Sequence, residues 1–421
     1  MDGSPPRTAR DVTSYWGKME DHSLISNLVL ALVLAFFFGL IAQRLRISPL
    51  VGYLLAGVAV GPYTPGFVGD SGLAFQFAEI GVILLMFGVG LKFSLDDLWA
   101  VRGVALPGAL VQMSAATLLG WGVGLLMGMS HAEAIMLGFS LSVASTVVLL
   151  RALEDRGIVK SENGRITVGW LVVEDIAIVL AIVLLPALAA IAHGEAATPA
   201  QTAQTLGVTI GKIAIFVVLM LIVGARVFPW LIVRIAHTKS RELLSLGTLA
   251  LALGVAYVAA TLFDASFALG AFLGGVALNG SKFTHRVAED SQPLRDTFAV
   301  LFFVSVGMLF DPMTLVRQPV GVLAVVTIIV VGKALAALAI TTLYKLPIRT
   351  GMMIAVALAQ VGEFSFVLAG MGVRLDLMST DTYNLILASA LISIALNPIL
   401  FRVGEGIAQR VEARAEPSAT A

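Results

Sequence analysis

The 421 residues of the chain are 58% hydrophobic and 13% charged, and the mean hydropathy is +0.95. A soluble domain carries roughly 25% charged residues, so this composition indicates an integral membrane protein. The 27 Lys and Arg residues equal the 27 Asp and Glu residues, which argues against a nucleic-acid partner, because that partner requires a basic surface. Zero cysteines exclude disulfides and thiolate chemistry, and the five histidines form no HExxH motif, so neither a zinc enzyme nor another cofactor is expected.

Apolar stretches long enough to cross a bilayer follow one another almost without interruption. About 20 apolar residues span the hydrocarbon core as a helix. We count thirteen such spans, at 24–43, 48–61, 74–91, 103–127, 132–152, 163–192, 207–233, 241–262, 265–280, 293–310, 318–343, 348–374 and 382–405. The second and ninth are short enough to need tilt or a neighbouring helix. The sequence therefore predicts an all-α polytopic membrane protein with a polar N-terminal tail at 1–23.

The distribution of positive charge predicts the orientation, because loops rich in Lys and Arg stay in the cytoplasm. If successive spans cross the membrane in opposite directions, about nineteen of the Lys and Arg residues fall on one side of it. The other side holds only Lys212, Arg317 and Arg374, apart from three in the N-terminal tail. We therefore expect a multi-pass protein of the cell (inner) membrane, with its N-terminus outside and its C-terminus in the cytoplasm.

Four ionisable residues lie inside the predicted spans, namely Glu174, Asp175, Lys333 and Glu363. A charge at mid-membrane costs at least about 2.5 kcal/mol, so each needs a partner, an aqueous cavity or a function. At 1.5 Å per residue, the last three lie roughly 15 to 22 Å from the cytoplasmic ends of their spans, which predicts one polar site near the midplane. A salt bridge that only stabilises the bundle is the alternative for Lys333.

The adjacent carboxylates of Glu174 and Asp175 repel each other, and one lysine cannot neutralise both. Paired carboxylates in a low-dielectric cavity hold protons more tightly than in water, so they can exchange a proton for a cation, which is the chemistry of an antiporter. An intramembrane aspartyl protease places its aspartates on separate helices, whereas these two residues are consecutive. We expect Glu174 and Lys333 to form an ion pair that opens when the site changes state, with direct pairing of Lys333 to Asp175 as the alternative.

Two spans are interrupted by polar residues near their middle. Ser140, Ser142, Ser145 and Thr146 interrupt the fifth span, and Gln360 to Glu363 interrupt the twelfth. Paired interruptions in two halves of a transporter indicate its binding site, because backbone released from helical hydrogen bonds must line a cavity. Alternatively, the serines bond back to carbonyls within an unbroken helix.

Seven longer stretches carry a family signal. They are RISPLVGYLLAGVAVGPYTPGF from Arg46, GVILLMFGVGLKFSLDDL from Gly81, SVASTVVLLRALEDRG from Ser142, VGWLVVEDIAIVL from Val168, FALGAFLGGVALN from Phe267, RDTFAVLFFVSVGMLFDP from Arg295 and AQVGEFSFVLAG from Ala359. From about residue 24 to residue 405, the chain resembles the cation:proton antiporter-2 family. Within it, the chain is most similar to the Kef-type potassium:proton antiporters and to their YbaL branch.

The resemblance implies a sodium:proton antiporter-like fold, with two inverted repeats and two broken helices that cross at the midplane. The implied division is a scaffold or dimer region at 24–91 and 241–310, a core at 103–192 and 318–405, a linker helix at 207–233 and a cytoplasmic tail at 406–421. It also implies a homodimer. Kef-type proteins usually continue into a nucleotide-binding domain with a GxGxxG motif, which this sequence does not contain, so nucleotide regulation is not expected from this chain.

The resemblance also assigns roles to the polar residues of the predicted site. Asp175 matches the essential ion-binding and proton-carrying aspartate, and Glu174 matches the position before it. Ser145 and Thr146 match the residues of the first broken helix near the ion, whereas the supporting residues are Lys333, Gln360 and Glu363. We favour a structural role for Glu363, in which its charge is stabilised by the positive end of a half-helix, over a role in transport.

These inferences predict a secondary active antiporter that exchanges a monovalent cation, K⁺ or Na⁺ with K⁺ favoured, for H⁺ by alternating access. A gated K⁺ efflux channel is the alternative, although the sequence contains no TVGYG filter. A membrane-embedded enzyme is disfavoured because cysteine, a histidine cluster and a GxSxG motif are all absent.

Overall fold

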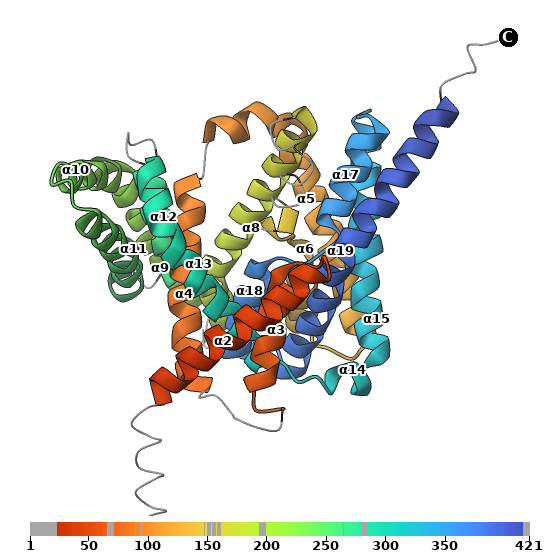
Figure 1. Cartoon of the computed structure of the whole chain (residues 1–421), viewed down its shortest axis with the longest axis horizontal. Coiled ribbons are helices and arrows are strands. Elements are labelled where there is room, and N and C mark those ends of the chain that lie inside the picture. The colour runs from red at the N-terminus through yellow and green to blue at the C-terminus, as the bar shows by residue number, and fades with distance from the viewer. Residues whose placement is uncertain are drawn as a thin grey trace, which may run out of the picture.

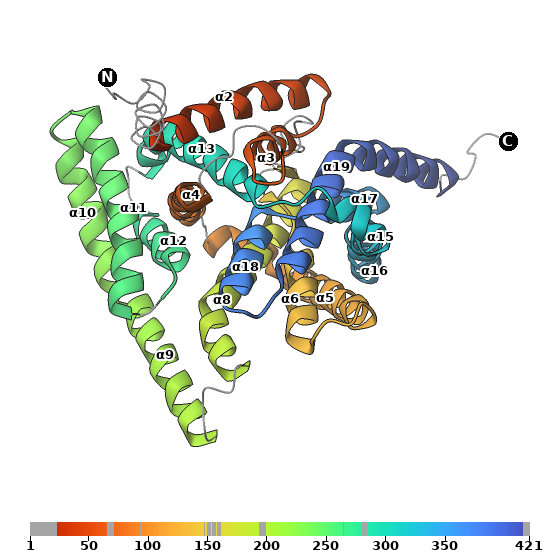
Figure 2. The same ribbon diagram turned by 90° about the horizontal axis from the view of Figure 1, so that it is seen from below.

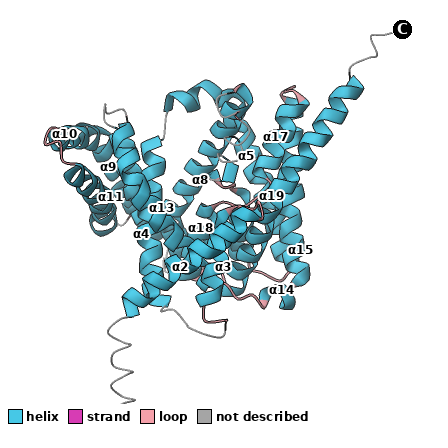
Figure 3. Cartoon of the chain, viewed as in Figure 1, coloured by secondary structure: helices cyan, strands magenta, loops and turns pink. Residues whose placement is uncertain are grey.

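The computed structural model describes residues 23–64, 71–92, 95–146, 148–149, 153, 157, 161–192, 199–263, 265–279 and 284–415, and within these ranges it contains helices and loops but no strand (Figure 3). Nine helices of the described part are long and apolar enough to cross a membrane. Two shorter apolar helices, α3 (Pro49–Val60) and α12 (Phe267–Leu278), correspond to the two spans predicted to be short. The all-α polytopic architecture is therefore confirmed.

One group of helices packs through close backbone contacts, and we call it the glycine-packed bundle. It consists of α2 (Ser23–Arg44), α3, α4 (Ser71–Lys92), α11 (Arg241–Phe263), α12 and α13 (Thr284–Met308). A Cβ atom on Gly57 of α3 would overlap the carbonyl of Val304 in α13, and one on Gly307 of α13 would overlap the carbonyl of Leu54 in α3. These glycines let the two backbones approach closely, as small residues do between membrane helices.

The remaining long helices form a second group, which we call the crossing bundle. Its first half contains α5 (Leu95–Leu126), α6 (His131–Ser142) and α8 (Glu162–Ala192). Its second half contains α15 (Pro319–Thr327), the π-helical turn η2 (Ile328–Gly332), α16 (Lys333–Leu343), α17 (Ile348–Leu358), α18 (Glu363–Arg374) and α19 (Thr380–Ala415). In each half an interrupted segment lies between two longer helical segments, as the predicted repeats require.

A long bent helix joins the halves of the chain. It consists of α9 (Pro199–Leu219), the π-helical turn η1 (Met220–Gly224) and α10 (Ala225–Ala236), and α9 contacts both α8 and α11. Seen from below, α9 to α11 lie on one side of the molecule, α5, α6 and α16 lie on the other, and α18 lies between them (Figure 2). The N-terminal end of α2 and the C-terminal end of α19 lie far apart (Figure 1).

Several helices extend beyond the apolar spans from which they were predicted. α5 begins at Leu95 rather than at 103, and α9 begins at Pro199 rather than at 207. α13 begins at Thr284 rather than at 293, because its first turns are polar and carry no hydropathy signal. α19 continues to Ala415, ten residues past the predicted end of the last span at 405. Part of the predicted tail is therefore helical.

Candidate functional site

The two interrupted segments cross each other, and their backbones are bonded at the crossing. α6 ends at Ser142 and is followed by extended backbone, while Gly362 at the start of α18 is also extended. The Gly362 N–H donates to the carbonyl of Val143 at 3.0 Å. A Cβ atom on Gly362 would lie 2.6 Å from the carbonyl oxygen of Ala144. A side chain at this position would therefore push the two segments apart.

Lys333 and Gln360 satisfy carbonyl groups that the two breaks release. The Lys333 Nζ atom donates to the Gln360 carbonyl at 2.9 Å, and the Gln360 Nε2 atom donates to the Ser145 carbonyl at 3.1 Å. Both side chains are fully buried. Because an unpaired buried carbonyl is costly, these two bonds stabilise the non-helical backbone of both segments, and they connect α16 to the crossing.

The adjacent acids of α8 contact the first break from the other side. Glu174 accepts a hydrogen bond from the Ala144 N–H at 2.8 Å, and Asp175 accepts one from the Thr146 hydroxyl at 2.9 Å. The Ser145 hydroxyl accepts a hydrogen bond from the Val148 N–H at 3.2 Å and also interacts with the Glu363 carboxyl group. The site therefore brings together all seven residues predicted from the sequence, including Lys333, Gln360 and Glu363.

The ion pair expected between Glu174 and Lys333, which was predicted to open when the site changes state, is not formed in this conformation. The two charges interact electrostatically, but the ion pairs of the described residues do not include them. Each has another partner, because the break offers Glu174 a backbone N–H and offers Lys333 a carbonyl. In this conformation, therefore, Glu174 and Lys333 each bond to a free backbone group rather than to each other.

Three carboxylates and one ammonium group share the site. Asp175 interacts electrostatically with both Glu363 and Glu174, and each of the three acids has one buried oxygen without a hydrogen-bond partner. With every group ionised, three negative charges and one positive charge leave a net charge of −2. A site with this excess requires bound protons or cations, because uncompensated charge is costly in a low-dielectric interior.

Glu363 is the first residue of α18, at the positive end of that helix. This is the position in which we expected its charge to be stabilised by the half-helix. Its carboxyl group is nevertheless buried and close enough to interact with Asp175, so it also contributes to the charge of the site.

Two buried amide residues support the breaks and were not predicted. The Gln112 Nε2 atom in α5 donates to the Ser142 carbonyl at 3.0 Å, and the Asn397 Nδ2 atom in α19 donates to the Val356 carbonyl at 3.1 Å. Charges and hydroxyl groups within the spans predicted the rest of the site. Amide side chains in the middle of apolar spans are the further signal that would have found both residues.

The site has no preformed cluster of the kind that holds a transition metal. Within the described part of the chain, no group of three or more His, Cys, Asp or Glu side chains is arranged to hold a metal ion. The polar groups around Asp175 are instead the Thr146 hydroxyl and the carboxyl groups of Glu363 and Glu174. Oxygen donors of this mixture suit a hard monovalent cation rather than Zn²⁺.

The crossing of two interrupted helices with carboxylates beside it defines a membrane transporter of the sodium:proton antiporter fold. The sodium proton antiporter MjNhaP1 from Methanocaldococcus jannaschii matches with a TM-score of 0.70 at 17% identity, over 93% of this chain and 98% of that one. Residues 32–402 match the family described as "Sodium/hydrogen exchanger, transmembrane", and the chain belongs to this family. It is therefore a multi-pass membrane transporter of the cation/proton antiporter type and not an enzyme.

Curated relatives give the same family. The chain is 54% identical over 389 residues to YbaL of Escherichia coli (strain K12), named as a cation/proton antiporter, and the match covers 92% of this chain and 70% of that protein. It is 31% identical to the glutathione-regulated potassium-efflux system protein KefC of Cronobacter sakazakii, over 91% of this chain and 60% of that protein. The sequence predicted that the membrane-spanning region is similar to Kef-type proteins, and this prediction is confirmed.

Proposed function

We propose that the chain exchanges K⁺ for H⁺ by alternating access, with Asp175 as the group that binds the cation and the proton in turn. The observation that carries the proposal is the group of three buried carboxylates beside one lysine, each with an unpartnered oxygen. Protonation or cation binding would each reduce the net charge of −2. The two ligands therefore compete for the same oxygens, and this competition couples their movements.

Glu174, Ser145 and Thr146 would complete the ion site, and Lys333, Gln360 and Glu363 would support it. The Thr146 hydroxyl donates to one oxygen of Asp175, and the other oxygen is buried without a hydrogen-bond partner. The glycine-packed bundle would serve as the scaffold and homodimer surface, and the crossing bundle would move against it. K⁺ is favoured because potassium stands in the names of KefC and of K(+) efflux antiporter 4 of Arabidopsis thaliana, to which the chain is 31% identical.

Reconstitution tests the exchange directly. Proteoliposomes with an internal pH-sensitive dye would be given an outward K⁺, Na⁺ or Li⁺ gradient at equal ionic strength. We expect an internal acidification that depends on both K⁺ and the protein, is measured without valinomycin, and is absent from protein-free liposomes. A Na⁺ response of equal size would make the protein unselective, and K⁺ flux without proton movement would identify a channel.

The orientation has its own test. The positive loops predict an extracellular N-terminus and a cytoplasmic C-terminus in the inner membrane. Thr64 follows the C-terminal end of α3 and His237 follows that of α10, and the predicted topology puts them on opposite sides of the membrane. Because the chain contains no cysteine, the single substitutions Thr64→Cys and His237→Cys can each be tested in intact cells with an impermeant thiol reagent. We expect labelling of the Thr64→Cys variant alone.

A further inference from the structure

Within the part of the chain that the structure describes, three serine hydroxyl groups of the crossing bundle are buried without a hydrogen-bond partner. They belong to Ser140 in α6, Ser365 in α18 and Ser389 in α19, and each of these residues is 0% exposed. The three helices contact one another. The hydroxyl groups do not bond to each other, since such a bond would give each a partner. A buried hydroxyl group without a partner costs free energy, and we call these three residues the serine cluster.

A hydrogen bond near the N-terminal ends of α6 and α19 sets the register of these two helices. Glu133, in the first turn of α6, accepts from the Thr382 hydroxyl, in the first turn of α19, at 2.7 Å. Both helices run from this bond towards the crossing, where α6 ends and where α19 donates to the end of α17. Ser140 follows Glu133 by seven residues, and Ser389 follows Thr382 by seven residues. Because seven residues make about two helical turns, the two serines lie at the same level and on the same faces as the bonded pair.

The backbone bond at the crossing sets the register of α18 against α6. The Gly362 N–H, at the start of α18, donates to the Val143 carbonyl, at the end of α6. Because α6 ends where α18 begins and the two helices lie side by side, they run in opposite directions. Ser365 follows Gly362 by three residues, and Ser140 precedes Val143 by three residues. All three serines therefore lie at one level, about one helical turn from the crossing.

Other serines on the same helices show that burial does not by itself leave a hydroxyl group unpaired. The hydroxyl groups of Ser142 in α6 and Ser393 in α19 each donate to the carbonyl three residues earlier, at 2.7 and 3.0 Å. Helical serines commonly bond back to the preceding turn in this way. Ser140 and Ser389 do not, so their hydrogens and lone pairs remain available for a partner that lies between the helices.

We propose that the serine cluster binds one water molecule, which forms a hydrogen bond with each of the three hydroxyl groups. A buried water molecule typically makes about three hydrogen bonds to polar groups that would otherwise be unpaired. The three residues carry no charge, so the site suits a neutral ligand, whereas the carboxylates beside the crossing suit a cation. Because α6 belongs to the first half of the crossing bundle and α18 and α19 belong to the second, the water joins the two halves through a contact that does not depend on the charge of the ion site.

The sign of the stability change on alanine substitution tests this proposal. With the full chain in nanodiscs, we expect Ser140→Ala, Ser365→Ala and Ser389→Ala each to lower the melting temperature by a few degrees, because the water loses a partner. The triple variant should lose less than the sum of the three single losses, because all three depend on one water molecule. If each substitution raises the melting temperature or leaves it unchanged, the cluster is dry and the proposal is wrong. Losses that simply add contradict it as well.

Ser393→Ala is the matched control, because this serine is equally buried in α19 but already has a carbonyl partner. Combined with Ser140→Ala, it should change the melting temperature additively. The unfolding would be repeated with K⁺, Na⁺ or choline as the only cation, and the coupling among the three serines should be the same in each. Stabilisation by K⁺ or Na⁺ that disappears in Ser365→Ala would identify a cation site in place of a water site and would overturn the proposal.

Electron cryo-microscopy gives a direct measurement of the same site. Density for the water should lie between the three hydroxyl groups in the unsubstituted chain, and it should be missing from the triple alanine variant. A map that shows other buried waters but none here would contradict the proposal. Neither measurement requires transport, so a chain that failed to exchange cations would still give a clear result.

Discussion

The two bundles of this chain differ in what they bury. In the glycine-packed bundle, the buried polar side chains of the described residues are Thr248 and Ser305. The crossing bundle buries four ionisable side chains together with Gln112, Gln360, Asn384, Asn397 and several serines and threonines. Burying polar groups costs free energy unless they are paired. One bundle is therefore built for close, uniform packing, while the other contains a polar site whose net charge must be compensated.

The largest effect on transport is expected from neutralising Asp175 in the crossing bundle. Asp175→Asn keeps the shape and the hydrogen bond to Thr146, but it removes the group that exchanges a proton for a cation. Cation-dependent proton movement should fall to the rate of empty liposomes, while the melting temperature stays within a few degrees of the unsubstituted chain.

Asp381→Asn, in the exposed first turn of α19, is the control for this change. It removes one negative charge from the same bundle without touching the crossing, so transport should continue. Residual cation-dependent proton movement in Asp175→Asn would contradict the proposed role of this residue.

The next largest effect is expected in the glycine-packed bundle, and it concerns the stability of the protein rather than transport. Gly57→Val places side-chain atoms where the Val304 carbonyl lies, and overpacking of this kind costs about 1 to 3 kcal/mol or more. We expect a lower melting temperature and a lower yield of folded protein. Gly254→Ala in α11, where a Cβ meets no atom within 4 Å, should leave both unchanged. Equal melting temperatures for the two variants would contradict the close packing of α3 and α13.

The sequence predicted both bundles better than it predicted the contacts inside them. Hydropathy predicted the spans, the interruptions around Ser145 and Gln360 predicted the breaks, and the family resemblance implied that the broken helices cross. It could not place the partners of Glu174 and Lys333, because a free N–H or carbonyl appears only after a helix breaks and leaves no trace in residue type. The first turns of α13 were missed for a different reason, because they are polar and the search relied on apolar residues.

Glu363→Gln should have a smaller effect, and it tests whether this residue is structural. A negative charge at a helix N-terminus contributes about 0.3 to 2 kcal/mol, so a structural role predicts a lower melting temperature with unchanged apparent affinity for the cation. A role in transport predicts normal stability with an altered pH dependence of exchange. Thermal unfolding and exchange rates measured between about pH 6 and pH 9 on the same preparation distinguish the two. Full stability with a displaced pH profile would show that the structural assignment is wrong.

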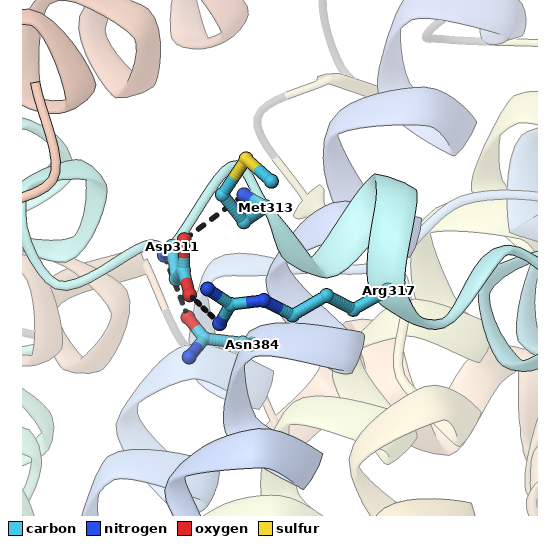
Figure 4. A network of polar contacts seen from close by, with 4 residues as sticks. All are labelled: Asp311, Met313, Arg317 and Asn384. Carbon is cyan, nitrogen blue, oxygen red and sulfur yellow. Dashed lines mark hydrogen bonds and ion pairs between the residues drawn. The ribbon is translucent and has the colours of Figure 1, made fainter.

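The smallest effect is expected from an exposed arginine at the place where the chain passes from one bundle to the other, after α13. Figure 4 shows Asp311 there as the centre of a polar network that holds α14 (Thr314–Arg317) against α19. Its N–H donates to the Asn384 Oδ1 atom at 3.0 Å, and its carboxylate accepts from the Met313 N–H at 2.9 Å and from Arg317 at 3.1 Å.

These contacts differ in burial, and so should the cost of removing them. Arg317 is 67% exposed, so Arg317→Gln should lower the free energy of unfolding by less than about 1 kcal/mol. Asn384 is buried, and Asn384→Leu leaves the Asp311 N–H without its acceptor, which costs about 1 to 3 kcal/mol. Thermal unfolding of both variants would rank the contacts. If Arg317→Gln were the more damaging, the junction would be held by its exposed ion pair rather than by the buried amide.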